Sequence, residues 1–82
     1  GINALNVYKV NTDSFVTIAG ITPDLQQLDV RLFSMLGVAV KQTLLNTTTA
    51  SQRVSTAGLA SGLYVVQIKS GNRIIVKKII VK

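Results

Sequence analysis

Residues 63–82 read LYVVQIKSGNRIIVKKIIVK, two aliphatic runs separated by Ser70-Gly71-Asn72. Gly and Asn favour turns because they tolerate backbone conformations that other residues avoid. Leu63 to Lys69 is apolar on both faces at its start, which is typical of a central strand. Ile74 to Lys82 is predicted to form the last strand. This end of the chain is therefore expected to be β-structure.

Similar short runs, bounded by turn-forming residues, recur about every ten residues along the rest of the chain. They are Leu5 to Val10, Phe15 to Ile18, Val38 to Leu44 and Arg53 to Thr56. The last run is short and polar, as an edge strand should be. This spacing predicts an all-β sandwich or barrel.

Residues 22–37 carry conflicting local signals. Thr22-Pro23 is typical of a helix start, leucines recur near helical spacing between residues 25 and 36, and Gly37 suits a helix C-terminus. The alternative is a strand from Leu28 to Phe33, with Leu28, Val30 and Leu32 facing inward and a turn at residues 34–37. Local signals alone leave both structures open over residues 23–36. Because the rest of the pattern is β, we predict the strand.

The last strand conflicts with simple alternation. If Ile74 and Val76 face the core, strict period two buries Lys78, whereas an inward Ile79 places Lys77 inside. Burial of an unpaired ammonium group is too costly to accept. A bulge near Lys77-Lys78 would shift the phase and leave both lysines in water, so we expect one there.

The composition excludes most catalytic chemistry. The 82 residues form one small domain and contain no His, no Cys and no Glu, so the usual bases, nucleophiles and transition-metal ligands are missing. The only acids are Asp13, Asp24 and Asp29. Asp13 lies in Asn11-Thr12-Asp13-Ser14, whose residues are ordinary turn formers. We expect no enzyme activity, no metal site and no cofactor.

The formal charge of +6 is concentrated at the C-terminal end. Residues 69–82 hold five cations and no acid. Such a field favours anionic partners, but the chain lacks aromatic residues interleaved with the basic ones, so we expect no nucleic-acid partner. Lys77, Lys78 and Lys82 either solubilise and protect the edge of a very apolar strand or present their charge to a partner. The apolar runs are too short for a transmembrane helix, and no signal peptide precedes them. We expect a fragment of a longer precursor with a natural C-terminus at Lys82.

Two stretches resemble a known family. The first is Leu59-Ala60-Ser61-Gly62-Leu63-Tyr64-Val65-Val66, followed at the chain end by Lys77-Lys78-Ile79-Ile80-Val81-Lys82. The second is a hairpin whose matching residues are Val30, Leu32, Gly37, Val38 and Val40. Together they are similar to the type A C-terminal sorting domain of type IX secretion substrates in the Bacteroidetes. The hairpin departs from the family pattern, because Ser34 and Val38 stand where Asp and Arg are frequent.

This resemblance implies an immunoglobulin-like β-sandwich of about seven antiparallel strands in two sheets, carried as residues 1–82 at the end of a larger precursor. It implies passage through the periplasm to the outer membrane, cell surface or medium. The implied partners are outer-membrane translocon or shuttle proteins and a sortase-like peptidase that removes the domain. The implied recognition residues are Leu59, Gly62, Tyr64, Val66, Lys77, Lys78, Ile79, Ile80, Val81 and Lys82, with the hairpin set above.

For Leu59, Gly62 and Tyr64 a structural role is the simpler expectation: a plug at one end of the sandwich, a backbone conformation and a core ring. Exposed edges can also exchange between copies, so a domain-swapped or weak dimer is a further expectation. The alternative function is an immunoglobulin- or fibronectin-like adhesion module of a cell-surface protein.

Overall fold

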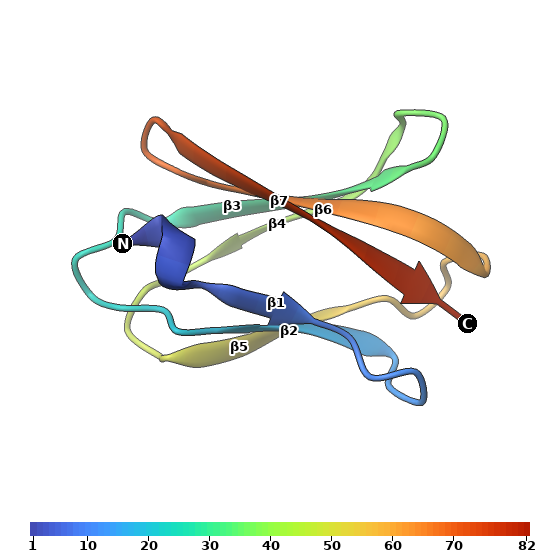
Figure 1. Ribbon diagram of the computed structural model, residues 1–82, viewed down its shortest axis with the longest axis horizontal. Coiled ribbons are helices and arrows are strands. Elements are labelled where there is room, and N and C mark those ends of the chain that lie inside the picture. Colours follow the sequence, from blue (N-terminus) through green and yellow to red (C-terminus); the bar gives the residue numbers. More distant parts are fainter.

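The computed structural model describes residues 1–82 as two antiparallel β-sheets packed face to face (Figure 1). The chain begins with a short 3-10 turn, η1, and continues through seven strands. Their bounds are η1 Ile2–Ala4, β1 Asn6–Tyr8, β2 Phe15–Ala19, β3 Leu28–Ser34, β4 Ala39–Leu45, β5 Ser51–Ser55, β6 Gly62–Ser70 and β7 Arg73–Val81. The prediction of an all-β sandwich with about seven strands is confirmed.

One sheet has three strands in the order β1-β2-β5, and the other has four in the order β4-β3-β6-β7. In the larger sheet β3 and β6 are interior, which confirms the central position expected for Leu63 to Lys69. β5 lies at an edge, as its short polar sequence predicts. β1 is shorter than the run Leu5 to Val10, because its pairing with β2 ends at Tyr8 opposite Thr17.

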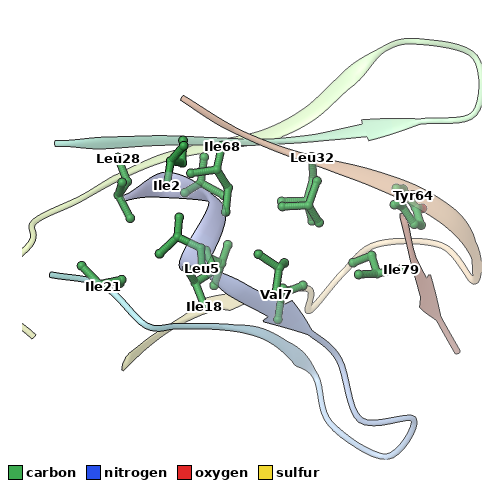
Figure 2. Close-up of a cluster of buried hydrophobic side chains, with 14 of the residues drawn as sticks. Ile2, Leu5, Val7, Ile18, Ile21, Leu28, Leu32, Tyr64, Ile68 and Ile79 are labelled. Carbon is green, nitrogen blue, oxygen red and sulfur yellow. The ribbon is translucent and has the colours of Figure 1, made fainter. Parts of the chain in front are cut away.

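The core lies between the sheets and consists of alternate residues of the strands (Figure 2). Period-two alternation sends one side chain inward and the next outward, so each strand contributes half of its residues. The buried hydrophobic set is Ile2, Leu5, Val7, Val16, Ile18, Ile21, Leu28, Val30, Leu32, Val54, Tyr64, Val66, Ile68, Ile79 and Val81.

Residues 28–34 are a strand and not a helix, as the β context predicts. Leu28, Val30 and Leu32 are buried, and the side chains between them face outward. A turn then joins β3 to β4, in which the Ser34 amide donates to the Val38 carbonyl at 2.9 Å. Gly37 has φ +81°, the positive value that glycine supplies at this position.

The prediction of a bulge near Lys77-Lys78 was wrong. β6 and β7 pair without a shift from Gly62↔Val81 to Ser70↔Arg73. Ile75, Ile79 and Val81 point inward, whereas Ile74 and Val76 point outward. Lys77 shares the inward side but stays exposed, because β7 is the outermost of four strands and the facing sheet has only three. No ammonium group is buried, so the strand needs no change of phase.

Candidate recognition surface

β7 is the free edge of the four-stranded sheet. It pairs with β6 along its whole length and has no strand on its other side, although η1 packs against it (Figure 1). Its outer row of backbone N–H and C=O groups is therefore open to another strand. A shallow groove of about 380 Å³ lies beside this edge, between β7 and the end of β1, and its lining includes Tyr8, Lys9, Lys78 and Ile80.

The terminal motif divides into core and exposed residues. Ile79 and Val81 are only 5% exposed and pack between the sheets. Lys77, Lys78 and Ile80 are exposed, and so is Lys82, which follows the strand. The side chains that a partner can contact directly are thus the three lysines and Ile80. The two buried residues hold the strand in place.

The residues before β7 in the family-like motif are structural. The Tyr64 ring is buried, and its hydroxyl donates a 2.6 Å hydrogen bond to the Ala60 carbonyl. Val66 is buried, Leu59 packs against the core from the loop before β6, and Gly62 begins that strand with φ +156°. These positions agree with the structural roles expected for Leu59, Gly62 and Tyr64.

The hairpin motif lies at the opposite edge of the same sheet. Val30 and Leu32 are core residues of β3, Gly37 is in the turn, and Val38 and Val40 are exposed at the start of β4. Ser34 pairs with Tyr64, and Tyr64 pairs with Ile79, so this hairpin turn and the end of β7 share one end of the sheet. The structure therefore brings the two motifs to the same end but not into one cluster.

Positive charge on this surface is almost uncompensated. The single salt bridge joins Arg31 to Asp29 at 3.2 Å on the outward side of β3. The hydrogen bond from Arg31 holds the pKa of Asp29 below its usual value, and a further bond from Gln42 acts in the same direction. The lysines of β7 have no acidic partner, so their charge is available to an anionic surface.

The structure contains no cluster of three His, Cys, Asp or Glu side chains that could hold a metal ion. It also contains no helix of the length and apolarity needed to span a bilayer.

A family model for the secretion system C-terminal sorting domain matches residues 6–82. The chain belongs to this family. The sorting domain is that of type IX secretion, and it implies interaction with the type IX machinery and export to the outer membrane, the cell surface or the medium. Family and fold together indicate a non-catalytic module.

Among solved structures, the sorting domain is similar to a DUF3244 family protein from Bacteroides vulgatus ATCC 8482, a crystal structure described as an immunoglobulin-like β-sandwich. The TM-score is 0.79 at 16% sequence identity, over 96% of this chain and 84% of the other. At this identity the likeness establishes the immunoglobulin-like fold alone. No curated protein sequence matches the chain.

Ile74 and Val76 of β7 are exposed, although the sequence analysis had them facing the core if the strand contained a bulge. The signal that could have placed them outward was the end of the strand. Counting back by two from an inward Val81 gives Ile79, Lys77 and Ile75, which is the observed inward set once an exposed inward-side lysine is allowed.

Proposed function

We propose that the exposed edge and lysines of β7 are the part of this sorting domain that the outer-membrane translocon or its shuttle protein binds. The supporting observation is that the strand carrying the terminal motif is also the free, basic edge of the larger sheet. The whole domain acts as an address label for the cargo protein that carries it.

The mechanism has two parts with different physical roles. A partner strand added to the open edge of β7 gains backbone hydrogen bonds, which supply affinity with little dependence on sequence. Lys77, Lys78 and Lys82 attract an acidic partner surface, which speeds encounter and selects against basic competitors. The interior residues Ile79 and Val81 contribute by keeping the strand flat against the sandwich.

The order of events follows from this assignment. The precursor reaches the periplasm folded at its C-terminal end, β7 docks at the translocon, and the cargo crosses the outer membrane. A sortase-like peptidase then removes the domain and leaves the cargo on the surface or in the medium. Released cargo should therefore lack the sorting domain.

The direct test is an exported reporter fused to residues 1–82 in a bacterium that has a type IX secretion system. The expected result is reporter at the surface or in the medium, without the domain as measured by intact mass. A host strain without the translocon should retain the fusion in the periplasm. Equal surface delivery with and without the domain would contradict the sorting function, and would leave the adhesion alternative to be measured by cell attachment.

A further inference from the structure

The outward faces of the two sheets differ sharply in character. On the three-stranded sheet the outward residues are mostly small or polar: Asn6, Tyr8, Phe15, Thr17, Ala19, Ser51, Arg53 and Ser55. Its one phenylalanine, Phe15, lies under the guanidinium group of Arg53, 4.6 Å from the ring centre. This face is therefore adapted to water.

The outward face of the four-stranded sheet mixes polar residues with several exposed aliphatic ones, and we call it the aliphatic face. It comprises Asp29, Arg31 and Phe33 of β3, Gln42 and Leu44 of β4, Leu63, Val65, Gln67 and Lys69 of β6, and Ile74, Val76, Lys78 and Ile80 of β7. Ile74, Val76, Ile80 and Leu44 are each more than half exposed, at 51, 57, 54 and 58%.

Register places these side chains in continuous rows. Ile80 lies opposite Leu63, Lys78 opposite Val65, and Val65 in turn opposite Phe33. Cross-strand neighbours on one face lie within contact distance, so Ile80, Leu63, Val65 and Phe33 form a connected patch. Val76 and Ile74 extend it along β7, where they lie opposite Gln67 and Lys69. Connected exposed apolar patches mark interaction sites, whereas single exposed aliphatic residues need no explanation.

Nothing in the fold requires this composition. The core is closed by the inward residues, and β7 is held there by Ile75, Ile79 and Val81. Threonine would give the same β-branched shape on the outward side without exposing as much apolar surface. The same sandwich uses Thr and Ser on its other outward face.

The charges on the aliphatic face indicate the kind of partner. Asp29 bonds to Arg31 and Gln42 and also lies directly opposite Lys69, whose charge helps to lower the pKa of Asp29, which leaves Lys78 as a cation without an acidic neighbour. Lys78 lies between Val76 and Ile80 along the strand, inside the patch and not around it. Insertion into a bilayer would carry this ammonium group into hydrocarbon, which is costly, and membrane-surface proteins instead favour aromatic anchors. A protein surface can place a carboxylate opposite Lys78.

We propose that the aliphatic face is a second docking surface, which binds a protein surface that is apolar at its centre and bears a carboxylate facing Lys78. This inference rests on the proposed function, because the partner belongs to the type IX machinery. The binding surface then includes the outward face of all four strands in addition to the edge of β7.

The test uses I74T/V76T, which removes apolar surface from the face and leaves Lys77 to Lys82 unchanged. The matched control is V10T/L36T, since both residues are exposed but lie in or beside turns, away from the aliphatic face. We expect delivery of the fused reporter to fall about tenfold or more for I74T/V76T, as for residues central to an interface, and to stay near wild type for the control. Both variants should melt at the wild-type temperature.

A photo-crosslinking residue identifies what covers the face. Placed at Val76 during secretion, it should give an adduct with an outer-membrane component of the type IX machinery, identified by mass spectrometry. Placed at Thr17 on the polar sheet, it should give none. The purified domain should not float with vesicles of phosphatidylcholine and phosphatidylglycerol.

Three results would overturn the inference while the sorting function stands. These are wild-type delivery by I74T/V76T, an adduct from Val76 to a second copy of the domain, and flotation with vesicles that I74T/V76T abolishes. If the wild-type fusion itself is not delivered, the proposed function fails and this inference fails with it.

Discussion

The side chain of Tyr64 on β6 lies directly opposite that of Ile79 on β7, and both are buried between the sheets (Figure 2). The Tyr64 hydroxyl also donates to the Ala60 carbonyl at 2.6 Å, which fastens the loop before β6 to the same end of the core. The two separated parts of the family motif therefore meet inside the fold. Substitutions at these positions act on presentation of β7 through stability, whereas substitutions at exposed positions act on binding.

Ile79→Ala and Ile80→Thr separate these two roles within adjacent residues. Ile79→Ala should lower the free energy of unfolding by about 2–4 kcal/mol, because it opens a cavity in the core. Ile80→Thr should change it by less than about 0.5 kcal/mol, since the side chain is more than half exposed and stays β-branched. Urea unfolding measures both. Equal losses would show that the inward phase of β7 is misassigned.

Tyr64→Phe isolates the hydroxyl of this buried ring. Loss of the bond to Ala60 should cost about 1 kcal/mol. The control is Tyr8→Phe, which changes an exposed ring that makes no hydrogen bond through its hydroxyl and should be neutral. Thermal unfolding of the wild type, Tyr64→Phe and Tyr8→Phe measures both effects. A neutral Tyr64→Phe would mean that the bond to the loop contributes nothing to stability.

Gly20 and Gly37 have nearly the same positive φ, +82° and +81°, but different surroundings. A Cβ on Gly20 would lie 2.7 Å from the Ala4 carbonyl oxygen, whereas one on Gly37 would meet open space. Gly37→Ala should cost about 1–2 kcal/mol from backbone strain alone. Gly20→Ala should exceed that by at least about 1 kcal/mol, because the backbone must move apart. Chemical denaturation ranks the pair, and the reverse order would contradict the contact between η1 and residue 20.

Asp29 should make stability depend on acid pH. The hydrogen bond from Arg31 lowers the pKa of Asp29 in the folded state below its ordinary value of 3.8. Its stabilising contribution is therefore complete above that ordinary value and is lost as pH falls through the lower folded pKa. Asp29→Asn should flatten the acid limb of the stability curve, and Arg31→Gln should do the same. The effect is small, since both side chains are partly exposed. An unchanged acid limb in Asp29→Asn would contradict the pairing.

Much of this architecture was predictable from the amino-acid sequence, for reasons that individual residues make plain. The prediction of a strand over residues 28–33 was correct because the neighbouring segments are all β, although the leucines also suit a helix; the structure extends the strand to Ser34. The prediction that Gly37 lies in the hairpin turn was also correct, because that turn requires a positive φ.

Local alternation left the phase of β7 open, because Ile and Val occur on both of its faces, and counting back from Val81 fixes the phase only once Val81 is known to face inward. Only the pairing with β6 and the unequal width of the two sheets decide it. The aliphatic face could not be predicted from the sequence, because its residues come from four strands and lie together only in the folded sheet.

The most direct measurement is the fraction of a fused reporter that reaches the cell surface or medium when the charge of β7 alone is changed. K77Q/K78Q removes two exposed cations and leaves Ile79 and Val81 in the core, whereas deletion of residues 77–82 would also unfold the sandwich. The control K41Q/R53Q removes two cations elsewhere, together with the bond from Lys41 to the Ser55 carbonyl and the contact of Arg53 with Phe15. Our account predicts that delivery falls for K77Q/K78Q and persists for K41Q/R53Q. Undiminished delivery by a folded K77Q/K78Q would contradict it.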